Sequence, residues 1–305
     1  MKEKTNQHYV WQKYLEPWTT NGQIWCLREN KIFLTATRNI ASQRYFYDLS
    51  YINPDDINLI RRILVEPASE SLKPLCDTWL KQIEKVNAVV ADLTAKNLCK
   101  YSDFEMIYRN VYEELHGIVE SRGLDGLMLL RANKPNFLLD INTDNDIRMN
   151  FLFYLAVQYL RTKNMKANVK KNFLDNNPFS NIDSCINLMV PILATNFAYC
   201  LSNALIDKTI YYHMLINNTT IPFITGDQPV INIKANVDST QLTESLELYY
   251  PLSPVSALLI SAEKSASTSI NVDEAKYYNN TMQSQAFELI LANNRTSLLE
   301  YIDKG

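Results

Sequence analysis

Glycine is scarce in this sequence, and the common signatures of several enzyme classes are missing. Only 6 of the 305 residues are glycine, so long flexible linkers are not expected. The chain contains no glycine-rich phosphate loop, no HExxH or CxxC metal motif and no GxSxG nucleophile motif. These absences weigh against nucleotide-driven and serine-hydrolase mechanisms. They leave a hydrolase without a known motif, or a binding module.

The cysteines and the apolar runs limit the protein class further. The five cysteines are an odd number scattered along the chain, which favours free thiols in a reducing cytosol over a disulfide framework or a zinc site. The N-terminus MKEKTNQHY has no apolar core of a signal peptide. The longest apolar run, FLFYLAVQYL (151–160), is about half the length needed to span a bilayer. We therefore expect a soluble cytoplasmic protein with no membrane span.

The charge balance is slightly acidic, with a formal net charge of −3 and a pI of about 5.7. Non-specific binding of duplex nucleic acid depends on many lysine and arginine contacts to phosphates, so a broad nucleic-acid surface is not expected. A local basic groove remains compatible with this composition. A chain of 305 residues is long enough for one large domain or two small ones.

The order of patterns along the chain predicts an α+β fold. The stretches GQIWCLRE and KIFLTATR are rich in β-branched and aromatic residues around an Asn30 turn, which indicates a hairpin. A helical middle follows at about 54–206, a β-rich part at about 208–262 and a last helix at about 273–293. We expect a single domain, 1–305, in which one antiparallel sheet combines the N-terminal hairpin with the C-terminal strands and packs against the helical layer.

Within the helical middle, the residues predict several separate helices. NPDDINLIRRIL begins like a helix, with Asn53 as the cap and Pro54 in the first turn. SRGLDGLMLLRANKPN (121–136) is rich in turn residues and predicts a long surface connection. The remaining predicted helices cover the SLKPLCDTWLKQIEKV segment and residues 103–120, 146–173 and 182–206.

The first candidate for chemistry is His8, in the segment HYVWQKYLEPWT. A histidine titrates near neutral pH and serves as acid, base or metal ligand. The alternative is that His8 only bonds a backbone carbonyl while Tyr9 and its apolar neighbours pack. His116 and His213 lie in amphipathic patterns, which favours structural roles for both.

The second candidate is Asp227, in the segment FITGDQPV (223–230). An apolar strand ends at Thr225 and Gly226 and then presents this carboxylate, which is where rigid scaffolds commonly place a reacting group. The alternative is a turn in which Asp227 caps the backbone.

Two further pairs have helical spacing. Gln158 and Arg161 share a face directly after an apolar run, so Arg161 is expected to be half buried and to need a carboxylate or phosphate partner. Glu66 and Glu70 are four residues apart and could bind a metal or share a proton, although exposed glutamates at a helix start are commoner.

Several motifs together resemble a bacterial family known as domain of unknown function number 4238. HYVWQKYLEPW resembles its opening HYVPxxYLRxF, and GQIWCLRENKIF, TATRNIASQRYFYD, LAVQYLRT, FITGDQPV and YYPLSPVSALLI follow in the order of that family. The likeness runs from residue 7 to about 295. His8, Tyr9, Gln158, Arg161 and Asp227 match family positions. The sequence departs from the pattern at Trp11, Glu16 and Gln228, where the family has proline, arginine and asparagine, and the missing arginine weakens any anion-binding role of the N-terminal segment.

The resemblance implies a role in single-gene antiphage defence of the Borvo type, in which infection triggers growth arrest or death of the host cell. It favours a toxin-like effector, a nuclease or other hydrolase of RNA or nucleotides. Because unusual polar residues lie at the edges of apolar elements in three separate segments, we expect His8, Arg161 and Asp227 to meet in one pocket, with Tyr9, Gln158 and Glu70 as further members. A divalent metal, Mg²⁺ or Mn²⁺, held by Asp227 and Glu70 is one route. A metal-free route with His8 as base and Arg161 on the phosphate is the other. The alternatives to an enzyme are a sensor that recognises a phage protein and a structural protein whose polar residues only fix the fold.

Overall fold

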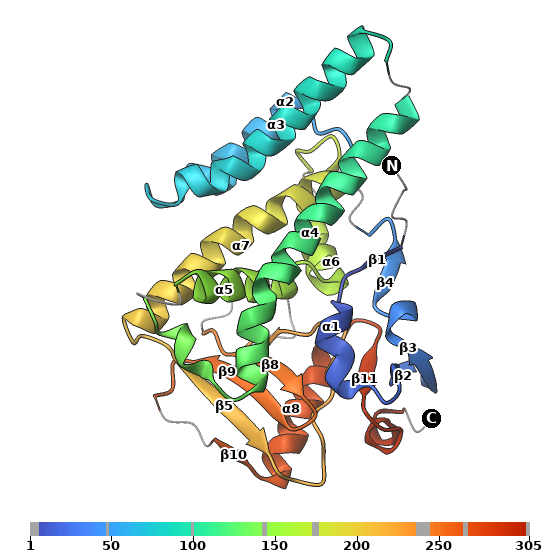
Figure 1. Cartoon of the computed structure of the whole chain (residues 1–305), viewed down its shortest axis with the longest axis vertical. Helices are drawn as coiled ribbons and strands as arrows, with labels where there is room; N and C mark the ends of the chain where they lie inside the picture. The colour runs from blue at the N-terminus through green and yellow to red at the C-terminus, as the bar shows by residue number, and fades with distance from the viewer. Residues whose placement is uncertain are drawn as a thin grey trace.

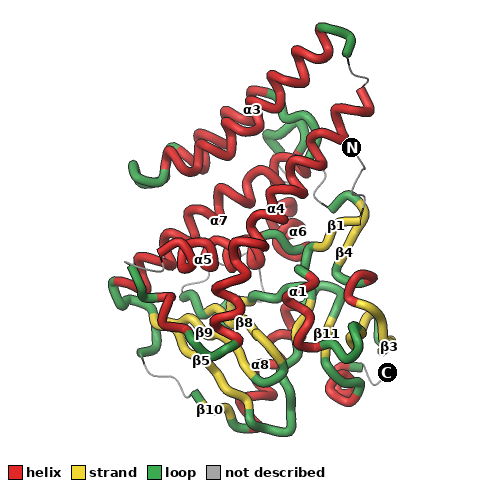
Figure 2. The backbone as a smooth tube through the Cα atoms, in the orientation of Figure 1, coloured by secondary structure: helices red, strands yellow, loops and turns green. Residues whose placement is uncertain are grey.

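The computed structural model has an α+β fold, as predicted, and describes residues 6–46, 49–98, 101–141, 145–172, 177–235, 245–264 and 268–302. Long helices form one half of the molecule and most of the strands form the other (Figure 1). The tube view in Figure 2 shows the same division, with the helices α3, α4 and α7 on one side of strands β5, β8 and β9.

A four-stranded sheet joins the two ends of the chain. Its order is β3-β2-β11-β6, and its strand pairs are antiparallel. The N-terminal hairpin therefore shares a sheet with C-terminal strands, as predicted. The strands are β2 (Gln23–Arg28), β3 (Lys31–Ala36), β6 (Thr225–Gly226) and β11 (Ile290–Ala292).

A second sheet has five strands in the order β10-β5-β9-β8-β7. Its pairs are antiparallel except that β10 runs parallel to β5. The prediction of one antiparallel sheet was therefore wrong in two details, because the strands form separate sheets and one pair is parallel. A separate pair, β1 with β4, leads the N-terminal segment into the fold. The strands are β1 (Asn6–His8), β4 (Ser42–Arg44), β5 (Tyr211–Asn217), β7 (Ile231–Asn232), β8 (Leu248–Ser253), β9 (Ser256–Ser261) and β10 (Ser269–Ile270).

The helical layer packs on one face of the five-stranded sheet. Helix α5 contacts α4 and α7, and α4 also contacts β8. The α-helices are α1 (Gln12–Leu15), α2 (Pro54–Ile60), α3 (Lys73–Ala95), α4 (Tyr101–Arg131), α5 (Asn145–Leu160), α6 (Lys163–Asn172), α7 (Ile182–Ile206) and α8 (Val272–Gln285). A π-helix follows α2 at Arg61–Val65, and 3-10 helices cover Glu16–Trp18, Thr37–Asn39, Pro135–Leu138 and Thr296–Tyr301.

Strand alternation divides the core into two clusters. Tyr250 and Leu258 belong to the cluster that includes the helices and the N-terminal segment. Their strand neighbours Tyr249 and Leu259 point the other way and pack in the cluster that contains α8. The five-stranded sheet is thus buried on both faces, because successive side chains of a strand point to opposite sides.

Local signals explain several helix starts. Asn53 caps α2 by accepting a hydrogen bond of 2.7 Å from the backbone N–H of Asp56, and Pro54 occupies the first turn, as predicted. At α8, Asn271 and Glu274 form a reciprocal capping box.

Three predicted boundaries were wrong. Residues 121–131 continue α4 and are not a surface connection, because Gly123 and Gly126 let α5 approach closely. The predicted helix 146–173 is two helices, α5 and α6, that break at Arg161 and Thr162. The predicted last helix 273–293 ends at Gln285, and strand β11 follows.

Helix α7 is long and apolar enough, by length and composition, to cross a membrane, and 67% of its most apolar window is buried inside the fold. It packs against α5 and α3. A buried core helix of a soluble protein has the same composition, so this helix alone does not indicate a membrane span.

Candidate functional site

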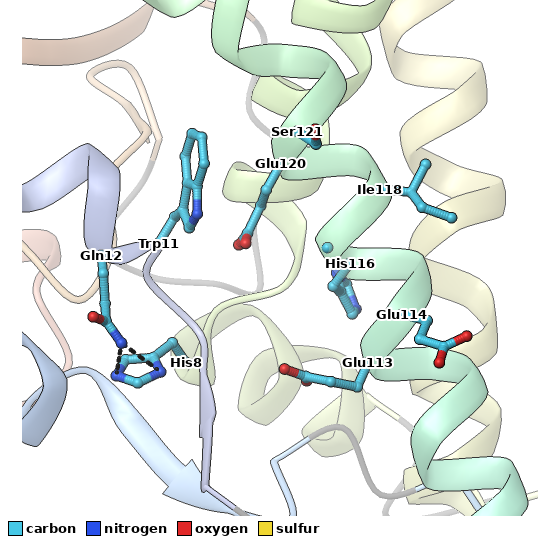
Figure 3. Close-up of a pocket in the computed structure, with 10 residues that line it drawn as sticks. His8, Trp11, Gln12, Glu113, Glu114, His116, Ile118, Glu120 and Ser121 are labelled. Carbon is cyan, nitrogen blue, oxygen red and sulfur yellow. Dashed lines mark hydrogen bonds between the residues drawn. The ribbon is translucent and has the colours of Figure 1, made fainter. Parts of the chain in front are cut away.

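The N-terminal segment and α4 enclose a cavity of about 690 Å³. This volume lies within the range of about 300–1,000 Å³ that is usual for ligand pockets. Figure 3 shows the cavity between the two elements. Its lining residues are His8, Trp11, Gln12, Glu113, Glu114, His116, Gly117, Ile118, Glu120 and Ser121.

Backbone hydrogen bonds hold the N-terminal segment in place. The N–H groups of Tyr9 and Val10 both donate to the carbonyl oxygen of Ala41, at 2.9 and 3.4 Å. The ring of Tyr9 packs on Phe46, with ring centroids 5.0 Å apart. On the other side of the cavity, the carboxylates of Glu113 and Glu120 point from α4 towards this segment (Figure 3).

His8 is half buried and held by two neighbours. Gln12 Nε2 lies 2.9 Å from His8 Nε2 and 3.3 Å from His8 Nδ1, and the imidazole also has a hydrogen bond with the backbone of Arg38. Burial lowers the pKa of His8 below its ordinary 6.5, the Arg38 bond opposes this, and the charge of Arg161 lowers it further. His8 is therefore mostly neutral at pH 7.

Arg161 lies directly behind the cavity lining. Its Nη2 donates to Glu120 Oε1 at 2.5 Å, and its Nη1 lies 3.4 Å from His116 Nδ1. Burial raises the pKa of Glu120, and the ion pair with Arg161 opposes that rise. Burial, aided by the charges of Arg161 and Lys166, holds the pKa of His116 well below its ordinary value. The structure thus brings Arg161 to the same site as His8, with Glu120 and His116 between the guanidinium and the cavity.

Gln158 is fully buried in α5. It shares a face of α5 with Tyr154, whose ring contacts Trp11 edge to face with centroids 5.8 Å apart, and it precedes Arg161 by one turn. Within the described part of the chain, neither its amide nitrogen nor its amide oxygen has a hydrogen-bond partner. A buried amide of this kind costs folding free energy and calls for an explanation.

Asp227 does not line this cavity. Both of its carboxylate oxygens accept backbone N–H bonds, from Phe287 at 2.9 Å, Glu288 at 2.7 Å and Leu289 at 3.2 Å. Burial raises its pKa, and the N–H donors of Phe287 and Glu288 oppose the rise. Asp227 therefore binds backbone N–H groups, but those of a loop 60 to 62 residues away and not of its own turn, as the alternative expected. The expected place in a pocket with His8 is not what the structure shows either.

The loop capped by Asp227 carries Glu288 to the N-terminal segment. Glu288 Oε1 accepts a hydrogen bond of 3.0 Å from the Tyr9 hydroxyl and one of 2.6 Å from Lys163 Nζ. Arg28 lies 3.7 Å from the same carboxylate. Burial raises the pKa of Tyr9, and the charges of Glu288 and Asp227 raise it further, so Tyr9 stays a neutral donor. Tyr9 and Asp227 are thus linked to the site as supports for the segment that holds His8.

Glu70 lies on the surface before α3, where its side chain is 90% exposed and pairs with Lys73 at 2.6 Å. It does not line the cavity, and residues 66–72 form turns and no helix, so Glu66 and Glu70 do not share a helical face. Within the described ranges, no group of three or more histidine, cysteine, aspartate or glutamate side chains is placed to hold a metal ion. The residues present do not fit the expected Mg²⁺ or Mn²⁺ site on Asp227 and Glu70.

The sequence predictions missed Trp11, Glu113 and Glu120, and they assigned His116 a structural role. A signal was present: Glu113, His116 and Glu120 are three and four residues apart, so they share one face of the helix predicted at 103–120. Their partner across the cavity, the N-terminal segment, is more than 100 residues away in sequence, and no local pattern reveals that contact.

Comparisons with known proteins do not add a relative: no family model matches the chain, and no curated protein or solved structure matches it. The resemblance described from the motifs therefore stays an expectation.

Proposed function

We propose that the cavity is the catalytic site of a hydrolase of RNA or nucleotides, and that the protein is a toxin-like antiphage effector of the cytoplasm, activated by infection. The observation that supports a catalytic site is His8. It is an imidazole kept in its neutral form, oriented by Gln12 and by the Arg38 backbone, at the edge of a ligand-sized cavity. The part of the proposal that concerns infection rests on the family resemblance.

The chemistry of His8 is that of a general base. The neutral imidazole takes a proton from the attacking water as the water oxygen bonds to the phosphorus of a phosphate ester and the bond from phosphorus to the leaving oxygen breaks. The leaving oxygen takes a proton from solvent, and the imidazolium returns its proton to solvent. A positioned base of this kind contributes about 10²–10⁴-fold to rate. Arg161 does not contact the reacting atoms; it is a positioning residue that holds Glu120 and His116 on the opposite side of the cavity.

The test uses cells that express the full chain and are infected with phages that trigger it. RNA is sequenced and nucleotides are profiled for the wild type and for His8→Gln, with Glu70→Gln as the surface control. We expect new RNA ends or depleted nucleotides with the wild type and the control, and neither with His8→Gln. Identical pools in wild type and His8→Gln, with growth still arrested by the wild type, would refute the hydrolase proposal.

A second candidate function is a sensor that binds a phage protein without catalysis. The observation in its favour is the charge of the described cavity lining, which has three glutamates and neither lysine nor arginine. Such a lining suits a basic side chain of a trigger protein. Under this alternative, Glu113→Gln should abolish the response to phage while His8→Gln retains it.

A further inference from the structure

The cavity lining is acidic, so it favours ligand groups that donate hydrogen bonds and disfavours phosphate. Glu113, Glu114 and Glu120 contribute carboxylates, and burial keeps His8 and His116 neutral at pH 7. Among the described lining residues there is no lysine or arginine to neutralise a phosphate. A nucleotide that enters this cavity therefore places its uncharged, donor-bearing base inside and keeps its phosphate at the opening.

Trp11 supplies a surface for an aromatic ring. Its indole is half buried, and its edge-to-face contact with Tyr154 fixes its orientation against the core. The indole and the Glu120 carboxylate project into the same cavity (Figure 3). Stacking on an aromatic side chain is worth about 1–3 kcal/mol per base and is tolerant of base identity, so specificity must come from the neighbouring polar group.

We infer that the cavity recognises a guanine base, which stacks on Trp11 and donates two hydrogen bonds to the carboxylate of Glu120. Hydrolysis of the bound nucleotide rests on the proposed function, whereas binding of the guanine base does not. Arg161 holds Glu120 Oε1 from behind at 2.5 Å, so this carboxylate has a fixed orientation.

The four bases differ in what they offer to a carboxylate. Guanine presents two adjacent donors, N1–H and the N2 amino group, which match the two oxygens of a carboxylate. Adenine and cytosine each present one amino group beside a ring acceptor, and uracil presents one N–H between two carbonyl oxygens. A carboxylate therefore makes two favourable bonds only with guanine and faces a repelling lone pair with the others.

The same placement keeps the phosphate outside the acidic lining. With the base against Trp11 and Glu120, the ribose and phosphate extend towards His8, which is held by Gln12 and by the backbone of Arg38. The scissile ester then lies at the general base.

Ligand analogues test the recognition without altering the protein. Calorimetric titration of the full chain should show that guanosine binds about tenfold or more tightly than adenosine, inosine, which lacks the N2 amino group, and 1-methylguanosine, which lacks the N1–H. GMP and a short single-stranded RNA with one guanine distinguish a free nucleotide from RNA as the source of the base. Equal binding of all the nucleosides, or no binding of guanosine, would overturn the inference.

Variants test the two named residues. Trp11→Ala should weaken guanosine binding about tenfold while Trp11→Phe retains it, and Glu120→Gln should remove the preference for guanosine over inosine. Glu70→Gln is the control, since the Glu70 side chain is 90% exposed and does not line the cavity. If Glu120→Gln does not fold, the two Trp11 variants and the nucleoside analogues still test the proposal. Unchanged guanosine affinity in Trp11→Ala would contradict the proposal.

Measurements of binding and of hydrolysis test the guanine site and the hydrolase separately. Guanosine binding by the wild type and by His8→Gln, with no hydrolysis by either, supports the guanine site and refutes the hydrolase. Hydrolysis that depends on His8 with no preference for guanine supports the hydrolase and refutes the guanine site.

Discussion

Arg161 and Glu120 form an ion pair of 2.5 Å in which the arginine side chain is fully buried and the glutamate side chain is 15% exposed. The pair joins the break between α5 and α6 to the middle of α4, at the back of the cavity. Buried ion pairs of this kind tolerate joint replacement better than the loss of one partner, because one partner alone is an uncompensated buried charge.

Arg161→Met should therefore lower the free energy of unfolding by about 3–5 kcal/mol. The double variant Arg161→Met with Glu120→Leu should recover much of that loss. Chemical denaturation of the wild type, both single variants and the double variant gives the coupling between the residues. Additive effects would show that the pair does not act as a unit.

Asp227 and Glu70 were both expected at a metal site, and the structure gives them opposite environments. Asp227→Ala should destabilise the protein by about 3 kcal/mol or more, because its oxygens accept three backbone N–H bonds and each bond to a charged group is worth about 1.5–3 kcal/mol. Glu70→Ala should leave stability unchanged, since it breaks only an exposed pair with Lys73. Thermal unfolding of the two variants, with and without Mg²⁺, checks both statements. A stabilising effect of Mg²⁺ on the wild type that Asp227→Ala removes would contradict the capping role.

The two glycines of α4 at positions 117 and 123 should respond oppositely to alanine. A Cβ at Gly123 would lie 2.4 Å from Tyr154 Cβ, so Gly123→Ala should cost about 1–3 kcal/mol through overpacking. A Cβ at Gly117 meets nothing within 4 Å, so Gly117→Ala should stabilise the helix by about 0.5–1 kcal/mol. The denaturation midpoints of the two variants measure these stability changes. Equal midpoint shifts for both variants would mean that α4 and α5 are further apart than described.

His116 should make the protein sensitive to acid. Its folded pKa is well below 6.5 while the unfolded chain has the ordinary value, so the unfolded state binds more protons between the two. Its contribution is fully present above about pH 6.5 and is lost as the pH falls, by up to about 1.4 kcal/mol per pH unit. Denaturation at pH 7.5, 6.5 and 5.5 should show this slope in the wild type and a smaller one in His116→Gln. Parallel slopes would exclude His116 as the cause.

Gln158 should carry a cost in stability. Gln158→Met keeps the side-chain volume and removes a buried amide that has no hydrogen-bond partner in the described part of the chain, so it should raise the unfolding free energy by about 1–3 kcal/mol. Calorimetric unfolding measures the change. A loss of stability would mean that the amide has a partner, such as an ordered water.

Much of the fold could be predicted because its signals are local. The hairpin at Gln23–Ala36, the cap at Asn53 and helix α7 follow from alternation, capping residues and composition. The break after α5 could not be predicted from local pattern. Gln228 donates to the carbonyl of Tyr159 at 3.1 Å and accepts from the hydroxyl of Thr162, so a residue 66 positions away ends the helix.

The site was predictable only in part for the same reason. His8 and Arg161 stood out as unusual polar residues beside apolar segments. Glu120 looks like an ordinary exposed helix residue in the sequence, and only its contact with Arg161, 41 positions away, makes it part of the site. Asp227 stood out as a carboxylate at the end of an apolar strand, but its partners are backbone groups 60 to 62 residues away, which leave no trace in the side-chain pattern.

Besides its bonds to the nearby Ala41, the N-terminal segment makes three side-chain hydrogen bonds to residues from the far end of the chain. Tyr9 bonds Glu288, Tyr14 bonds Thr225 and the Trp18 indole bonds the carbonyl of Phe223, across separations of 279, 211 and 205 residues. Closing such large loops is the slow part of folding, because the entropy of the chain is lost before the contacts form. The N-terminal segment is therefore among the last parts of the described chain to reach its final position. The cavity that contains His8 and Trp11 is consequently expected to form late in folding, once the loop with Glu288 has reached Tyr9.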